Sequence, residues 1–343
     1  MDFSRKDFIK KTTFASLTGL VFAKENKFSK LSKPYSNKIK PNALKSGDTL
    51  GLVAPGSPIY EKSVFDKMLA DLENLGFNLK LGEFVREQRG YLAGTDHQRA
   101  EDLHNMFQDP EVDGIMCIRG GWGCNRILPL LDFEIIHENP KVFCGFSDIT
   151  SLHMAFYEKS DLLIFHGPVG KSTWNSFTKK AFRSVLENGE TPSFEIPNGQ
   201  GDGFIISSGK TEGILLGGNL SVLVSMIGSD YLPSFEGAIL FLEDVGESVY
   251  RVDRMLTQLK LAGILDEISG FVFGKCTDCN AGNNSLSLKE VFDDHIKPLN
   301  IPAFYGAMIS HEDNNITLPV GQKAIIDATR KVIKMTQPAV TEA

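Results

Sequence analysis

The stretch Lys141–Thr150, KVFCGFSDIT, most constrains what this chain can form. Its apolar letters VFC are typical of a short buried strand, and the glycine after them permits a sharp turn. From Asp148 onward the residues favour the start of a helix. Ser147 therefore stands between a strand end and a helix start, where the first helical N–H groups can stabilise a developing oxyanion. The pattern fits a nucleophile elbow, and it also fits a plain helix cap.

Strands and helices alternate along the first half of the chain. The sequence predicts a first strand over 48–58 that ends in a Pro/Gly turn, further strands at 78–81 and 114–118, and helices at 61–75 and 95–107. The run GIMCI is apolar throughout, as in a parallel strand buried on both faces. We therefore expect an α/β fold, with an open parallel-sheet N-terminal domain at 44–187 and ligands at the carboxyl ends of its strands.

The composition changes after residue 187. Five glycines and two prolines fall within 188–210, which we interpret as a linker. A smaller C-terminal domain with β-structure is expected over 211–335. Glu243 ends its predicted strand at 238–244, and His311 follows another apolar run at 303–310.

The first 43 residues are expected to lie outside the fold. Residues 1–23 carry a charged start, a short apolar segment and a small residue at position 23, which together predict a signal peptide. The letters SRKDFIK are similar to a twin-arginine signal, and 24–43 has the composition of a tether. We expect an exported, periplasmic protein without a stable membrane anchor. If residues 1–23 instead form an amphipathic helix, the protein is expected in the cytoplasm.

Charge and cysteine content exclude several classes of function. The formal net charge is −7 and no basic block stands out, which argues against a nucleic-acid partner. Five cysteines at irregular spacing do not form a disulfide framework. Cys276 and Cys279 form a lone C-x-x-C, which we interpret as free cysteines at a strand end in preference to a metal or redox site. We expect no metal and no cofactor.

Three residues have the chemistry of a serine hydrolase. Ser147 needs a base, and histidine is the usual one; His311 in turn needs an acceptor such as Glu243 to fix its tautomer. Residue types and spacing alone leave open whether the three side chains meet.

Seven motifs extend this pattern across nearly the whole chain. In order and spacing the chain resembles the LD-carboxypeptidase family of serine peptidases, which also includes the microcin C self-immunity peptidases. The resemblance covers about residues 44–327 and rests on VAPGSP, GYLAGTDHQRAEDL, IRGGWGCNRIL, CGFSDIT, EGILLGGNLSVL, LEDVGESVYRVDRML and SHEDNNITLPVG.

The resemblance implies roles for particular residues. It makes Ser147 the nucleophile, His311 the base and Glu243 its partner. It implies an oxyanion hole from the N–H groups of Asp148 and of a glycine in RGGWG, for which we choose Gly121. The family also implies the two-domain fold with the site between the domains, usually in a homodimer.

Other polar residues leave two interpretations each. Arg119 can bind a substrate carboxylate or pin the glycine-rich turn. Trp174 can line the pocket or anchor a loop. Glu247 and Glu312 are interpreted as solvated or structural, and His166 as a packed histidine.

The expected function is release of terminal D-alanine from an L,D-peptide bond of a muropeptide, the murein tetrapeptide, in cell-wall turnover. One alternative is an immunity-type serine peptidase that cleaves a peptidyl- or aminoacyl-nucleotide. Another is an exported muropeptide-binding protein without catalysis.

Overall fold

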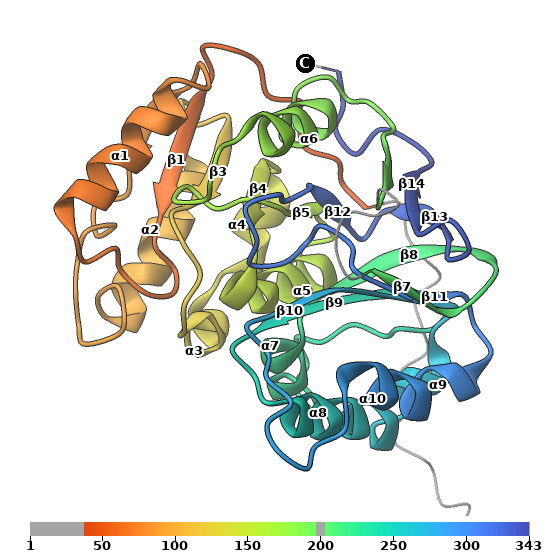
Figure 1. The fold of residues 1–343 in the computed structure, drawn as a ribbon. Helices are drawn as coiled ribbons and strands as arrows, with labels where there is room; N and C mark the ends of the chain where they lie inside the picture. The colour runs from red at the N-terminus through yellow and green to blue at the C-terminus, as the bar shows by residue number, and fades with distance from the viewer. Residues whose placement is uncertain (1–37, 197–202, 343) are drawn as a thin grey trace, which may run out of the picture. The chain divides into compact units, whose positions relative to one another are not determined.

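The first half of the chain builds a six-stranded sheet with the order β12-β5-β4-β3-β1-β2. The computed structural model describes residues 38–196 and 203–342 (Figure 1). Five strands are parallel, as expected, and β12 from the C-terminal part pairs antiparallel with β5 at one edge. The strands are β1 (Thr49–Val53), β2 (Asn78–Leu81), β3 (Gly114–Cys117), β4 (Val142–Gly145), β5 (Ile164–His166) and β12 (Leu318–Val320).

Helices cover both faces of this sheet. Buried side chains of α1 and most of those of α6 share one core cluster, and those of α2, α4 and α5 share another, so the two groups lie on opposite faces. The helix α2 begins at a capping box, in which Thr95 and Gln98 satisfy each other's backbone N–H groups. The helices are α1 (Lys62–Glu73), α2 (Asp96–Gln108), α3 (Cys124–Ile127), α4 (Phe133–Glu138), α5 (Thr150–Lys159) and α6 (Ser176–Leu186).

The second half builds a mixed eight-stranded sheet with the order β6-β14-β13-β8-β9-β10-β11-β7. The strands from β8 to β11 are parallel and the outer pairs are antiparallel. The segment 188–210, expected to be a linker, contributes β6 and β7 to this sheet. The strands are β6 (Ser193–Glu195), β7 (Phe204–Ser207), β8 (Lys210–Asn219), β9 (Ile239–Val245), β10 (Gly270–Thr277), β11 (Ala303–Tyr305), β13 (Lys323–Asp327) and β14 (Val332–Met335).

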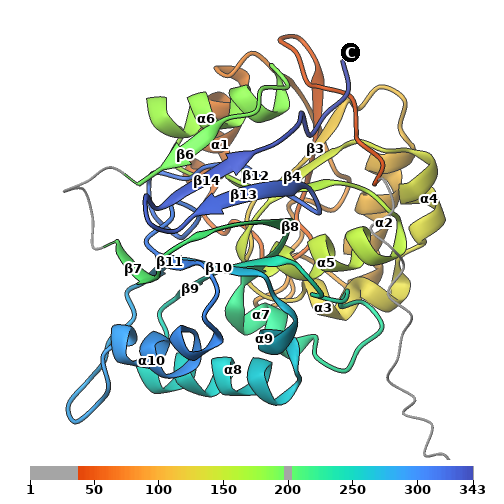
Figure 2. The same ribbon diagram turned by 90° about the vertical axis from the view of Figure 1, so that its right-hand side faces the viewer.

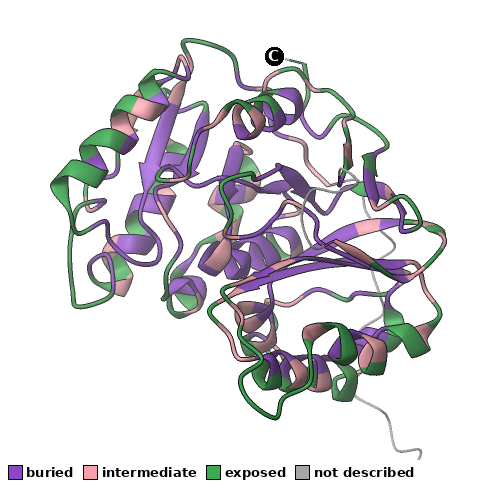
Figure 3. Ribbon diagram, in the orientation of Figure 1, coloured by how far each residue is buried: buried purple, intermediate pink, exposed green. Residues whose placement is uncertain are grey.

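Four helices cover one face of the second sheet, and α5 lies against its other face (Figures 1 and 2). The four helices are α7 (Leu220–Ser225), α8 (Val249–Leu261), α9 (Ile264–Glu267) and α10 (Leu288–His295). The central strands of both sheets are almost wholly buried, whereas the edge strands β2, β6 and β7 are partly exposed and most helices are buried along one side (Figure 3). This is the pattern of amphipathic helices packed on apolar sheets.

The two sheets meet at the start of α5. The N–H of Asn219, at the end of β8, donates to Thr150 Oγ1 over 2.8 Å. A Cβ on the neighbouring Gly218 would lie 2.4 Å from the same oxygen, so this approach requires glycine. The contact brings the carboxyl end of β8 beside the turn that carries Ser147.

The chain enters the fold before residue 44. Ile39 forms a bridge with Leu162, so the end of the expected tether at 24–43 is already packed. The expected signal peptide at 1–23 lies outside the described residues. Within the described part of the chain, no helix has the length and apolar character needed to cross a membrane.

Candidate active site

Ser147 occupies a strained turn between β4 and α5. Its backbone φ is 67°, in the left-handed region that residues with a Cβ rarely adopt. It begins a short 3-10 turn, Ser147–Ile149, that continues into α5. Such a conformation costs about 1–3 kcal/mol and is concentrated at functional sites. Here it results from reversing the chain directly after a buried strand.

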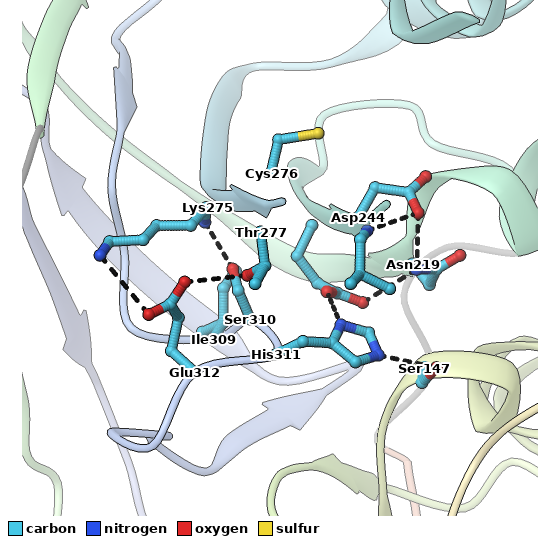
Figure 4. Close-up of polar contacts among 12 residues, drawn as sticks. Ser147, Asn219, Asp244, Lys275, Cys276, Thr277, Ile309, Ser310, His311 and Glu312 are labelled. Atoms are coloured by element: carbon cyan, nitrogen blue, oxygen red, sulfur yellow. Dashed lines mark hydrogen bonds and ion pairs between the residues drawn. The ribbon is translucent and has the colours of Figure 1, made fainter. Parts of the chain in front are cut away.

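His311 contacts this serine (Figure 4), and Glu243 completes the hydrogen-bonded chain. His311 Nε2 lies 3.0 Å from Ser147 Oγ, and Nδ1 lies 2.8 Å from Glu243 Oε2. Glu243 is fully buried near the end of β9, whereas the His311 side chain keeps 22% of its surface exposed. The arrangement suits proton transfer from the serine to the imidazole, with the carboxylate stabilising the imidazolium.

Two further residues hold the buried acid. Asn219 Nδ2 donates to Glu243 Oε1 and to Asp244 Oδ1, each over 3.2 Å. The carbonyl oxygen of the same amide accepts from Ser221 Oγ and from the backbone N–H of Val222, which fixes its orientation. Burial, followed by the adjacent charge of Glu243, raises the pKa of Asp244 to about 7.

The glycine-rich turn after β3 packs directly against the nucleophile. A Cβ on Gly120 would lie 2.8 Å from Ser147 Cβ, and the carbonyl of Gly120 accepts from the N–H of Ser57 over 3.1 Å. Apart from bonds within regular helices and strands, the described residues show no backbone acceptor for the N–H of Gly121 or of Asp148.

Buried charged groups fix this turn in place. Asp148 Oδ2 accepts from the N–H of Cys124 over 3.0 Å, and burial raises the pKa of Asp148. Arg99 of α2 donates from Nη1 to the carbonyl of Gly123 over 2.9 Å and to that of Pro55. Arg99 thus ties together the loops that follow β1 and β3.

The structure places the two expected substrate-binding residues differently. Arg119 donates from Nη1 to the carbonyl of Pro58 over 3.1 Å, while its Nε is buried without an acceptor in the described residues. Burial, then the nearby charge of Arg119, lowers the pKa of Lys171. The indole of Trp174 donates to the carbonyl of Gly170 and lies in a core cluster, so its contacts are those of a loop anchor.

The remaining polar residues have structural contacts. His166 is fully buried, with Nε2 2.8 Å from the carbonyl oxygen of Ile309, and burial lowers its pKa. Glu247 pairs with Arg251 at 3.6 Å, and Glu312 accepts from the hydroxyl of Thr277.

The interpretation of Cys276 and Cys279 as free cysteines is wrong, because the structure joins them in a disulfide. The turn after β10 brings the two sulfurs together, which cysteine counting cannot reveal. The described residues hold no cluster of three or more His, Cys, Asp or Glu side chains suited to a metal.

Sequence reasoning missed Asn219, Asp244 and Arg99. Each lies within one of the seven motifs on which the resemblance rests, and each has a feature in the sequence that could have indicated its role. Asn219 directly precedes α7 as its cap, Asp244 follows the predicted acid, and Arg99 is a charged residue on the inner side of an amphipathic helix.

Known proteins share both halves of this architecture. The LD-carboxypeptidase N-terminal domain matches residues 50–167, and the LD-carboxypeptidase C-terminal domain matches residues 212–326. A probable murein peptide carboxypeptidase of Bacillus subtilis is 39% identical over 312 residues, covering 87% of this chain and 94% of the relative. The murein tetrapeptide carboxypeptidase of Pseudomonas aeruginosa is 34% identical over 292 residues, covering 82% and 94%.

A solved structure agrees with the sequence comparison. The apo form of the microcin C7 self-immunity protein MccF superimposes with a TM-score of 0.82 and 28% identity, covering 88% of this chain and all of that one. Sequence and fold thus lead to the same group of proteins. This chain belongs to the LD-carboxypeptidase family.

Proposed function

We propose that the protein is a serine carboxypeptidase that releases terminal D-alanine from an L,D-peptide bond of the murein tetrapeptide. The hydrogen-bonded chain from Ser147 through His311 to Glu243 is the observation that carries the proposal. A binding protein without catalysis would not need a strained serine within 3.0 Å of an imidazole whose other nitrogen contacts a buried carboxylate.

In the first half-reaction, Ser147 Oγ attacks the carbonyl carbon of the scissile bond while His311 Nε2 takes the hydroxyl proton. Glu243 holds Nδ1–H and stabilises the imidazolium. The N–H groups of Gly121 and Asp148 donate to the developing oxyanion, as the family resemblance implies. Collapse of the tetrahedral intermediate breaks the peptide bond, and His311 gives its proton to the leaving amine of D-alanine.

In the second half-reaction, water hydrolyses the acyl-enzyme. His311 removes a proton from the water, whose oxygen attacks the acyl carbon, and the second tetrahedral intermediate collapses to release the peptide. Ser147 recovers its proton from His311. Each residue thus returns to its starting state.

Two observations support the choice of substrate: the name of a relative, and the two basic side chains of Arg119 and Lys171. The Pseudomonas aeruginosa relative is named for the murein tetrapeptide. A carboxypeptidase must also recognise a terminal carboxylate. Arg119 and Lys171 lie close enough for the charge of one to lower the pKa of the other, and Arg119 Nε has no acceptor in the described residues. We assign Arg119 to that carboxylate.

An immunity-type peptidase that cleaves a peptidyl- or aminoacyl-nucleotide is the second candidate. The TM-score of 0.82 with MccF favours it, because the two proteins share the whole framework of the site. The higher identity to the Bacillus subtilis relative ranks it below the muropeptide enzyme.

The proposed substrate belongs to the cell wall, which suits export through a signal peptide at residues 1–23 and a periplasmic location. N-terminal sequencing of the fractionated protein tests this: the mature chain should begin near residue 24, and an intact Met1 on cytoplasmic protein would refute export. We also propose a homodimer, to be checked by light scattering.

Mass spectrometry of a muramyl tetrapeptide incubated with the protein tests the activity directly. We expect loss of one D-alanine, and no loss with Ser147→Ala. Cleavage of an aminoacyl-nucleotide analogue without cleavage of the tetrapeptide would instead favour the second candidate. If the protein cleaves neither the tetrapeptide nor the nucleotide analogue, only the binding-protein candidate remains.

A further inference from the structure

The loop that carries His311 is held on both sides by the end of β10 (Figure 4). The backbone N–H of Lys275 donates to Ser310 Oγ, on the residue before the histidine. On the residue after it, Glu312 Oε1 accepts from Thr277 Oγ1 over 3.0 Å, and Glu312 Oε2 lies 3.7 Å from Lys275 Nζ. The orientation of His311 therefore depends on where this strand end lies.

The same strand end also contacts the segment after the buried acid. Cys276 and Thr277 of β10 pair in parallel register with Asp244 and Val245 of β9. One step further, the N–H of Gly246 donates to the carbonyl of Thr277 over 2.8 Å. Thr277 thus bonds through its backbone to the strand that carries Glu243, and through its hydroxyl to the loop that carries His311.

A disulfide closes the turn that follows Thr277. It joins Cys276 to Cys279. Between them Asp278 has a φ of 55°, a left-handed conformation that is unfavourable for a residue with a Cβ. The turn has one internal backbone hydrogen bond, from the N–H of Cys279 to the carbonyl of Cys276 over 3.2 Å. The cross-link therefore adds a covalent restraint on the position of Thr277.

We infer that the Cys276–Cys279 disulfide is a redox-sensitive brace that positions His311 through Thr277 and Glu312. The inference rests on the proposed function only in taking His311 as the base for Ser147. It makes Thr277 a positioning residue, because its hydroxyl acts on the base through the loop and contacts no reacting atom.

A dithiol can open the brace by ordinary exchange. A thiolate of the dithiol attacks Cys279 Sγ, the half-buried sulfur, because Cys276 is buried. The disulfide bond breaks, and Cys276 leaves as a thiolate that takes up a proton. The second thiol of the reagent then attacks the mixed disulfide, which frees Cys279 and leaves the reagent as a cyclic disulfide. The turn relaxes, and His311 spends less time aligned with Ser147.

The test measures the reactivity of Ser147 itself. The full chain, oxidised or treated with dithiothreitol, is reacted with a fluorophosphonate, and the limiting rate and the apparent binding constant for labelling Ser147 are determined. Because a small misplacement of a catalytic group is costly, we expect reduction to lower the limiting rate about 3- to 10-fold and to leave the binding constant unchanged. Alkylation mapping should find Cys276 and Cys279 modified, with the buried Cys117, Cys124 and Cys144 protected.

Variants separate the brace from general loosening of the fold. Cys276→Ser/Cys279→Ser should label at the rate of the reduced protein and no longer respond to dithiothreitol. Thr277→Val keeps the disulfide but removes the hydroxyl, so it should be slow even when oxidised. Thr277→Ser restores the hydroxyl and should restore the rate.

Equal labelling rates for the oxidised and reduced protein would overturn the inference, as would a wild-type rate for Thr277→Val. Tetrapeptide turnover by the oxidised protein is measured alongside. A redox-dependent labelling rate without tetrapeptide turnover means that the proposed substrate is wrong while the brace stands. Tetrapeptide turnover with a labelling rate that does not depend on redox state means that the proposed substrate is right and the brace is wrong.

Discussion

Replacing Glu243 with glutamine tests the site most directly, because both neighbours of this carboxylate are hydrogen-bond donors. Oε2 accepts from His311 Nδ1 at 2.8 Å, and Oε1 accepts from Asn219 Nδ2 at 3.2 Å. A glutamine has one carbonyl oxygen and one NH₂ group. If its oxygen faces His311, its NH₂ group faces the NH₂ group of Asn219. If its NH₂ group faces His311, either two donors meet there or the imidazole adopts the tautomer that cannot accept the serine proton.

The expected loss in kcat for Glu243→Gln is about 10²- to 10⁴-fold, or about 3 to 5 kcal/mol in the activation free energy. The side chain is fully buried, so water cannot replace the lost charge. The fold should persist, because the amide has the same shape and one unsatisfied buried contact costs about 1–3 kcal/mol in the free energy of unfolding.

The assay is release of D-alanine from the tetrapeptide at saturating substrate, with thermal unfolding measured in parallel. Glu247→Gln is the matched control: its side chain pairs with Arg251 near the surface, so kcat should change less than about 2-fold. A kcat for Glu243→Gln within about 3-fold of wild type would refute the assigned role. A crippled Glu247→Gln beside a normal Glu243→Gln would identify a different acid.

Four further outcomes are expected. Ser147→Ala and His311→Ala should each lower kcat at least as far as Glu243→Gln, and the double variant should be little worse than either, because the groups act as a unit; additive losses in D-alanine release would contradict this. Gly120→Ala should lower kcat about 10²-fold or more with the fold retained, since its Cβ would lie 2.8 Å from Ser147 Cβ and 3.1 Å from the carbonyl oxygen of Phe146; this is checked by kinetics and circular dichroism. The free energy of unfolding should fall as pH rises from about 4 to 7. Asp244 keeps its proton in the folded protein, where its pKa is raised to about 7, but loses it in the unfolded chain near the ordinary value of 3.8. This difference in pKa lowers the free energy of unfolding by at most about 4 kcal/mol over that pH range. Denaturant titrations of Asp244→Asn should therefore show a shallower decline of the free energy of unfolding with pH. Chelators should leave D-alanine release unchanged, because every proposed step uses side chains of the protein; loss of activity restored by zinc would overturn the serine mechanism.

Local pattern was sufficient for much of the fold. Apolar runs and helical spacing predict the parallel sheet of the first half, because its central strands β1, β3, β4 and β5 are buried on both faces and a helix such as α1 is buried on one. The position of Ser147 follows from the same local signals. The pairing of β12 with β5 does not, because it joins segments about 150 residues apart, and nothing in the letters TLPVG specifies a partner strand.

The three catalytic residues could be predicted from the sequence, but the residues that hold them in place could not. Ser147 and His311 are 164 residues apart, so only the family resemblance could suggest that they meet. The amide of Asn219 bridges two acids from a strand 24 residues later, which requires the register of β8 on β9. Likewise, the Cys276–Cys279 disulfide depends on a left-handed residue in a tight turn, which composition does not encode.

The register of β8 on β9 also explains how two adjacent acids can lie in the interior. Asn219 pairs with Glu243 in the parallel ladder, so its amide reaches both carboxyl groups at once. Two unscreened charges there would repel strongly. The raised pKa of Asp244 removes one of them below about pH 7, while the backbone N–H groups of Ser221 and Val245 support its charged form above that pH. Glu243 has only Asn219 and His311 as side-chain partners among the described residues, so its contacts, unlike those of Asp244, lead directly to the serine.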